Sequence, residues 1–143
     1  MYLLGGFILK KNIIITAIVF LIAASIFYVY QGSKSPSNYV KSDLAKAEEI
    51  IKAKENVAVF YTQKKCDWCK KTDGVLQPLL IENKDIKLYV VDVSIKKNRA
   101  AWKSEKLDGT PTIIRYENGI EAERILGFYD KEKYLKLLSK VEK

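Results

Sequence analysis

The strongest constraint on the fold is a run without any charged side chain at residues 13–30, IIITAIVFLIAASIFYVY. As a helix, this run would be about 27 Å long, close to the roughly 30 Å thickness of the hydrocarbon core of a bilayer. A domain built from the remaining ~110 residues is too small to surround so apolar a helix on all sides. The run therefore predicts a transmembrane anchor at residues 13–30, followed by a single compact domain.

The residues around this run predict how it crosses the membrane. Lys10 and Lys11 stand directly before it, and basic residues favour the cytoplasmic side, so residues 1–12 are expected in the cytoplasm. The predicted location is the cell membrane, crossed once, with the domain outside the cytoplasm. A cleaved signal peptide is the alternative, because Ala23 and Ser25 have the small-residue spacing of a cleavage site, and it would also export the domain.

The rest of the chain is predicted to form a linker and an α/β domain. Residues 31–41 begin with the polar sequence QGSKSPSN and are expected to link the anchor to a domain at residues 42–143. Hydrophobic patterns and capping residues predict, in order, a helix at 42–54, a strand at 57–62, a helix from the cysteines to about 83, a strand at 86–93, a helix at 96–106, strands at 112–116 and 120–126, and a helix capped by Asp130. Asn118-Gly119 is typical of a type I′ turn and makes the last two strands a hairpin. The predicted fold is a central mixed sheet, with parallel strands first and an antiparallel hairpin last, flanked by helices.

Few side chains in this sequence are of the types that usually catalyse reactions or bind metals. Histidine is absent, and the only cysteines are Cys66 and Cys69. A zinc site needs four ligands, commonly cysteine or histidine, so no metal ligand is assigned. A Cu(I) site between two thiolates, a structural disulfide and a redox-active disulfide all stay open. Although the net charge is +8, basic residues are scattered among acidic ones, so no nucleic-acid partner is predicted.

The two cysteines are expected at the start of a helix that follows a buried strand. The free N–H groups and positive dipole end of such a helix stabilise a thiolate on Cys66, which would be the attacking sulfur. Cys69 would be the more buried thiol that resolves the mixed disulfide. Lys65 and Lys70 add positive charge near the thiolate, and Asp67 opposes them.

A second motif, later in the sequence, helps to interpret the cysteine pair. Gly109-Thr110-Pro111-Thr112 leads into a predicted strand, and with the elements around it the sequence resembles the thioredoxin superfamily over about residues 42–142. The resemblance implies a thioredoxin-like fold and a redox-active disulfide with no other cofactor. It also implies that Pro111 follows a cis peptide bond beside the disulfide, and that Thr110 offers its backbone to a bound polypeptide. Trp68, between the two cysteines, is expected to line the docking surface.

The sequence departs from thioredoxins proper around the cysteines. It has Lys65-Cys66-Asp67-Trp68-Cys69-Lys70 in place of Trp-Cys-Gly-Pro-Cys-Lys, and Phe60 stands where the family places a buried acid. The chain is more similar to membrane-anchored extracytoplasmic thioredoxin-like proteins of Gram-positive bacteria, including bacteriocin transport accessory proteins.

This resemblance implies a thiol–disulfide oxidoreductase that acts on exported polypeptides and is reset by a redox partner protein. Whether it oxidises, isomerises or reduces its substrates stays open. A non-enzymatic accessory module of an exporter and a Cu(I)-handling dithiol protein are the alternative functions.

Overall fold

A computed structural model describes residues 3–32, 35–53 and 56–141, with the side chains of residues 12–27, 35–53 and 56–141. The chain forms two compact units, Met1–Ser35 and Pro36–Lys143.

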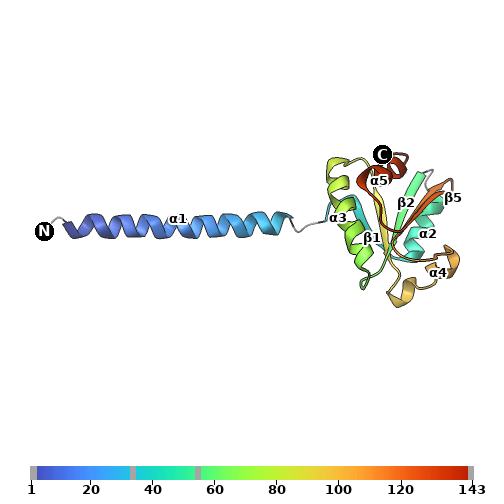
Figure 1. The fold of residues 1–143 in the computed structure, drawn as a ribbon, viewed down its shortest axis with the longest axis horizontal. Helices are drawn as coiled ribbons and strands as arrows, with labels where there is room; N and C mark the ends of the chain where they lie inside the picture. The colour runs from blue at the N-terminus through green and yellow to red at the C-terminus, as the bar shows by residue number, and fades with distance from the viewer. Residues whose placement is uncertain (1–2, 33–34, 54–55, 142–143) are drawn as a thin grey trace. The chain divides into compact units, whose positions relative to one another are not determined.

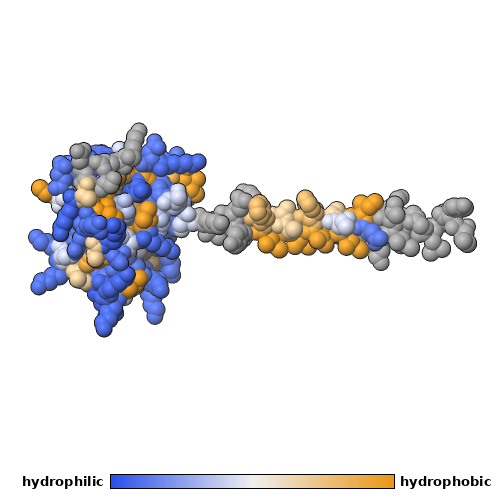
Figure 2. Space-filling model, turned by 180° about the vertical axis from the view of Figure 1, so that it is seen from behind, coloured by the Kyte–Doolittle hydropathy of each residue, from blue (hydrophilic) through white to orange (hydrophobic). Residues whose placement is uncertain are grey.

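The first unit is one helix, α1 (Leu3–Gly32), which contains the predicted anchor at residues 13–30. Its described large apolar side chains are exposed, with Phe20 at 77% and Leu21 at 69%, and Figure 2 shows them in orange along the helix. Within the described residues, no helix is both long enough and apolar enough to cross a membrane.

The second unit is a five-stranded sheet covered by helices on both faces (Figure 1). The strands are β1 (Tyr39–Ser42), β2 (Asn56–Thr62), β3 (Leu88–Asp92), β4 (Thr112–Glu117) and β5 (Ile120–Leu126). Their order across the sheet is β1-β3-β2-β4-β5. The pairs β1–β3 and β2–β3 are parallel, whereas β2–β4 and β4–β5 are antiparallel. This mixed sheet confirms the predicted fold class of the domain.

Two apolar cores, one on each face of the sheet, hold the helices in place. The helical elements of this unit are α2 (Leu44–Ala53), α3 (Asp67–Glu82), η1 (Lys96–Asn98), α4 (Ala101–Ser104) and α5 (Lys131–Leu138). Side chains alternate between the faces along the central strand β2: Phe60 joins the core under α3 and α5, and Val59 and Tyr61 join the core under α2 and α4. The continuous apolar run at residues 57–62 is therefore buried on both faces, as predicted.

Most local signals in the sequence are confirmed. The Asp130 carboxylate accepts a hydrogen bond from the Lys133 backbone N–H at 2.9 Å and caps α5. Asn118 and Gly119 both have positive φ angles, 51° and 80°, in the turn between β4 and β5. Helix α3 continues through Pro78 to Glu82.

Two expectations about the elements were wrong. Strand β1 was not predicted; it lies partly inside the predicted linker at 31–41, so ordered structure begins before residue 42. The predicted helix at 96–106 is instead the two short turns η1 and α4. The physical reason is Asn98, whose buried side chain accepts a hydrogen bond from the Leu44 backbone N–H at 3.0 Å and donates one to the Asp92 carbonyl at 2.9 Å. These tertiary bonds override the local helical pattern.

Candidate active site

Cys66 is the N-cap residue of α3, immediately after the loop that leaves the carboxyl end of β2. Its sulfur accepts a hydrogen bond from the Cys69 backbone N–H at 3.1 Å. The two cysteines form a disulfide, with their Cα atoms 5.1 Å apart. Cys69 is 1% exposed, whereas Cys66 is only half-buried. The structure thus places Cys66 as the accessible sulfur and Cys69 as the buried one, in the order that the sequence predicts.

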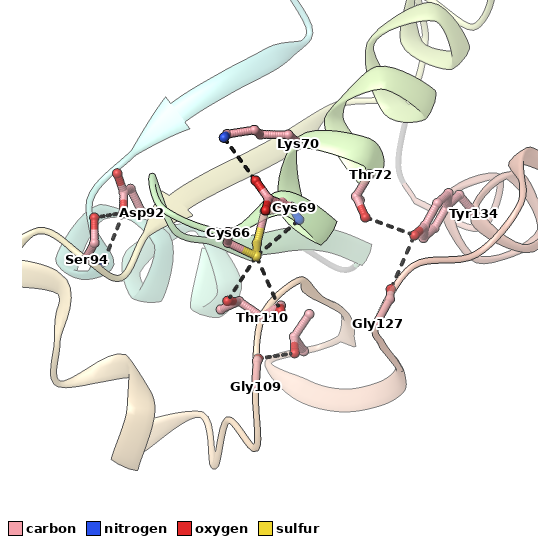
Figure 3. The surroundings of a disulfide bond; sticks show 12 residues. Cys66, Cys69, Lys70, Thr72, Asp92, Ser94, Gly109, Thr110, Gly127 and Tyr134 are labelled. Carbon is pink, nitrogen blue, oxygen red and sulfur yellow. Dashed lines mark hydrogen bonds and ion pairs between the residues drawn. A yellow bond between two sulfur atoms is a disulfide. The ribbon is translucent and has the colours of Figure 1, made fainter.

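The loop before β4 faces this disulfide (Figure 3). The Thr110 hydroxyl donates to Cys66 Sγ at 3.7 Å, and the Thr110 carbonyl oxygen lies 3.5 Å from the same sulfur. The Thr110–Pro111 peptide bond is cis, as the family resemblance implied. Two bonds hold the loop: the Thr112 hydroxyl donates to the Gly109 carbonyl at 2.8 Å, and the Gly127 N–H donates to the Pro111 carbonyl at 2.8 Å.

A shallow apolar pocket of about 230 Å³ lies beside the disulfide, lined by Trp68, Thr110, Pro111, Gly127 and Phe128. The rings of Trp68 and Phe128 are 5.9 Å apart, and both side chains are partly exposed, at 56% and 39%. The pocket brings together the three residues that the sequence assigned to substrate docking. It also adds Phe128, which sequence reasoning missed; its only signal is an aromatic residue directly after the strand-ending Gly127.

The loop that carries Phe128 is held by Tyr134 of α5. The Tyr134 hydroxyl accepts a hydrogen bond from the Tyr129 N–H at 2.8 Å and lies 3.3 Å from the Gly127 carbonyl. It also lies 3.3 Å from the Thr72 hydroxyl of α3 (Figure 3). Since Tyr134 is fully buried, these contacts tie the loop that carries Phe128 to the core of the domain.

The charged residues that the sequence placed near the cysteines, Lys65, Asp67 and Lys70, are all exposed. Lys70 Nζ lies 3.1 Å from the Asp67 carboxylate, so these two charges largely offset one another, and both side chains are strongly exposed. Lys65 is also exposed. The Cys69 N–H at the start of α3 donates directly to Cys66 Sγ, a position from which it would stabilise a thiolate on Cys66.

A carboxylate that the sequence analysis did not single out lies on the side of Cys69. Asp73 is half-buried and accepts a hydrogen bond from the Tyr39 hydroxyl of β1. The signal in the sequence was its spacing, because residues four apart on a helix share a face. Its strand partner could not be found without β1.

No three Cys, Asp or Glu side chains in the described part of the chain are grouped so that they could hold a metal ion.

Residues 43–142 match the family model described as a thioredoxin-like domain. The chain belongs to this family. It is 34% identical over 96 residues to a thioredoxin of Mycoplasma genitalium, covering 67% of this chain and 92% of that protein. It is 33% identical over 75 residues to a thioredoxin of Chlamydia trachomatis, covering 52% and 72%.

Solved thioredoxins share the fold of this thioredoxin-like domain at low sequence identity. A mutant thioredoxin from Halobacterium salinarum superposes with a TM-score of 0.63 at 19% identity, covering 78% of this chain and 96% of that one. Oxidised mitochondrial thioredoxin 3 from Saccharomyces cerevisiae gives 0.63 at 18% identity, covering 76% and 100%. Family membership and the Cys66–Cys69 disulfide together make this protein a thiol–disulfide oxidoreductase.

Proposed function

We propose that this thioredoxin-like protein is tethered to the cell membrane by α1 and exchanges disulfides with exported polypeptides. The observation that carries the proposal is the half-buried sulfur of Cys66, which opens beside an exposed aromatic pocket while Cys69 is closed off behind it. Such an arrangement lets a polypeptide reach one sulfur and protects the other until it is needed.

The reaction is a pair of sulfur exchanges. In the reduced protein, the Cys66 thiolate attacks a substrate disulfide, forming one S–S bond and releasing one substrate sulfur as a thiolate. Cys69, once deprotonated, attacks Cys66 Sγ, which closes the protein disulfide and releases the second substrate thiolate. The substrate gains two electrons and two protons, and the protein loses them. Running the same steps backwards oxidises a substrate dithiol.

The pocket of Trp68, Thr110, Pro111, Gly127 and Phe128 favours polypeptides with an apolar side chain near the reacting cysteine. The two partly exposed rings offer apolar area to such a side chain. Thr110 brings its backbone carbonyl to within 3.5 Å of the reacting sulfur, where an extended polypeptide would pass.

The tether is supported by the sequence and by the exposure of α1. Residues 13–30 carry no charge, and the described large apolar side chains of this helix are exposed, Phe20 and Leu21 to more than two thirds of their area. Apolar surface of this extent is normally covered, and lipid is the cover that fits a single helix. Lys10 and Lys11 favour the cytoplasmic side for residues 1–12, which leaves the catalytic domain outside. There it would meet exported polypeptides and no cytosolic thiol pool.

The exchange with exported polypeptides is tested by trapping. Cys69→Ser, expressed in the membrane of the source cells, cannot resolve mixed disulfides, so we expect discrete adducts on Cys66 that reductant releases. Cys66→Ser is the matched control and should trap none of them. If Cys69→Ser traps nothing while the double serine variant keeps wild-type function, or if the trapped polypeptides are cytosolic, the proposal is wrong.

The direction of electron flow is a property of the reduction potential of the Cys66–Cys69 pair. Relatives span roughly −270 mV for thioredoxin to −120 mV for strong oxidants. Equilibrating the protein with glutathione buffers measures this value: a potential near the lower limit makes it a reductant of exported proteins, and one near the upper limit makes it an oxidant.

A further inference from the structure

A second cavity, of about 370 Å³, lies on the Cys69 side of the disulfide. It is separate from the docking pocket, whose lining does not include Cys69. Its walls come from β1, the ends of β2 and β3, the loop that follows each of these two strands, and the first turns of α3. The polar and charged side chains that line it are Tyr39, Lys41, Ser42, Thr62, Gln63, Lys64, Lys70, Asp73 and Asp92. A cavity of this size, with these polar groups in its wall, has room for water, which would touch the Cys69 side chain that lines it.

Cys69 needs such a contact because it cannot react as a neutral thiol. Only the thiolate is nucleophilic, so the proton of Cys69 must leave before or while it attacks Cys66. The side chain is 1% exposed, which keeps its proton away from bulk solvent. The chain contains no histidine that could accept the proton.

Asp73 is placed to accept it. Cys69 and Asp73 are four residues apart on α3 and therefore lie on the same helix face, with Cβ atoms about 5–6 Å apart. Both line the same cavity. The Tyr39 hydroxyl donates to Asp73 Oδ1, which fixes the carboxylate and engages only one of its two oxygens.

Burial raises the pKa of the Asp73 carboxyl above its ordinary value, although the Tyr39 hydrogen bond and the charge of Lys41 lower it in part. A raised pKa makes the carboxylate a better proton acceptor. Burial, with the hydrogen bond to Asp73, raises the pKa of Tyr39 far above its ordinary value, so Tyr39 stays protonated and donates.

The other carboxylate in the cavity, Asp92, also has one oxygen engaged, but by the turn that follows β3. Asp92 accepts hydrogen bonds from the Ser94 backbone N–H at 2.9 Å and from the Ser94 hydroxyl at 2.5 Å (Figure 3). It shapes the turn after β3 and belongs to a different element from Cys69. Three lysines complete the charged groups that face the cavity: Lys41 from β1, Lys64 from the loop after β2, and Lys70 from α3.

We propose that Asp73 is the acid–base residue for Cys69, exchanging its proton through water in this cavity. In the reducing direction, the mixed disulfide joins Cys66 Sγ to the substrate sulfur. The Asp73 carboxylate takes the Cys69 proton, Cys69 Sγ bonds to Cys66 Sγ, and the substrate sulfur leaves with the electron pair of the broken bond. The proton on Asp73 then returns to solvent through the cavity, and solvent protonates the substrate thiolate.

In the oxidising direction the same path runs backwards. A substrate thiolate attacks Cys66 Sγ, Cys69 leaves as a thiolate, and protonated Asp73 returns the proton to it. The proposal therefore depends on the exchange reaction alone, and not on the tether, the location or the identity of the substrates.

The reactions of the two cysteines can be measured as two phases of a single stopped-flow trace. Reduced full-length protein in detergent is mixed by stopped flow with excess dithiobis(nitrobenzoate), a coloured probe. Attack by Cys66 releases a first thionitrobenzoate, and resolution by Cys69 releases a second. With Asp73→Asn, which keeps an acceptor for Tyr39, we expect the second phase to slow by about 10²-fold at neutral pH, the lower range for a lost proton acceptor. The first phase should be unchanged, which also shows that the variant is folded.

Two further variants make the result specific. Tyr39→Phe removes the bond that lowers the pKa of Asp73, so the acid limb of the pH profile of the second phase should move to higher pH. A purely structural role of Tyr39 would not move this limb. Asp92→Asn is the matched control from the same cavity and should leave both phases unchanged. The proposal is overturned if Asp73→Asn keeps the wild-type rate and pH profile of the second phase, or if Asp92→Asn shows the same loss.

Discussion

At the scale of single residues, Asp73 should be unfavourable for stability at neutral pH. Burial raises the pKa of its carboxyl, which means that the folded protein holds this proton more tightly than the unfolded chain. The resulting stabilisation is complete below the unfolded pKa and is lost as the pH rises through the raised folded pKa. Asp73→Asn should therefore raise the Tm at pH ~7, and the difference should shrink as the pH falls below ~4. Thermal unfolding followed by circular dichroism measures both values.

Asp43 provides a control, because its substitution by asparagine should change the Tm in the opposite direction. Its pKa is lowered, first by the hydrogen bond from Lys97 at 2.8 Å and then by the Lys46 backbone N–H at 2.9 Å. Stability from this group is present above the unfolded pKa and is lost as the pH falls through the folded one. Asp43→Asn should lower the Tm at neutral pH and have little effect in acid. Equal signs for the two variants would contradict this assignment.

Trp68 should matter for polypeptides and not for small disulfides. It forms one wall of the docking pocket with Phe128, and an aromatic contact of this kind is worth about 0.5–1.5 kcal/mol, or roughly 2- to 10-fold in a rate or binding constant. Trp68→Ala should reduce kcat/KM by that factor for a peptide disulfide with an apolar neighbour, and leave the rate with oxidised glutathione unchanged. Ile120→Ala alters a side chain that is 73% exposed on β5 and serves as the control. An equal loss on both substrates would show that Trp68 tunes the cysteines instead.

The residues of the site differ in how far the sequence could predict them. Cys66, Cys69, Thr110 and Pro111 belong to short motifs, so the sequence and its family resemblance could single them out before any fold was known. Phe128 and Asp73 carry no motif. They join the site only because α5 holds the loop after β5 against Trp68, and because β1 brings Tyr39 to α3.

At the scale of elements, the sequence predicted the structures that neighbouring residues determine. It did not predict the structures that depend on contacts with distant parts of the chain. The hairpin of β4 and β5 was predictable because Asn118-Gly119 accepts positive φ angles by itself. The short edge strand β1 was not, since it forms by pairing with β3 about fifty residues later in the chain. The pattern at residues 96–106 favoured a helix, but the buried Asn98 side chain bonds to two other elements there.

Two glycines test this local chemistry with opposite signs. Gly119 has a φ of +80°, and a Cβ added there meets only the Ile51 carbonyl oxygen, at 3.8 Å, so the effect of an alanine is purely conformational. Gly119→Ala should lower the free energy of unfolding by about 1–2 kcal/mol. Gly74 lies inside α3 with nothing within 4 Å of an added Cβ. Gly74→Ala should therefore raise the free energy of unfolding by about 0.5–1 kcal/mol, because alanine is the better helix former. Urea unfolding measures both; a loss of stability at Gly74 would contradict the helical argument.

At the scale of the whole molecule, the division into two units predicts that the second folds by itself. Every residue of the two apolar cores lies within Pro36–Lys143, on both sides of one continuous sheet. A protein of residues 36–143 should therefore unfold cooperatively and keep both phases of the exchange reaction. It should remain in solution, whereas the full-length chain should sediment with membranes and resist extraction by alkaline carbonate. Membrane association of the shorter protein would show that its own surface, and not residues 13–30, carries the attachment.

The side of the membrane on which the domain lies can be tested with its own cysteines. Cys66 and Cys69 are the only two in the chain, and Cys66 is the accessible one, so a thiol reagent reports on the active site alone. After mild reduction of intact cells, a membrane-impermeant maleimide should label the full-length protein as fully as it does in permeabilised cells. Cys66→Ser should abolish this early labelling, because Cys69 is buried. If labelling requires permeabilisation, the domain faces the cytoplasm, where reduced thiol pools would keep the pair reduced, and its substrates cannot be exported polypeptides.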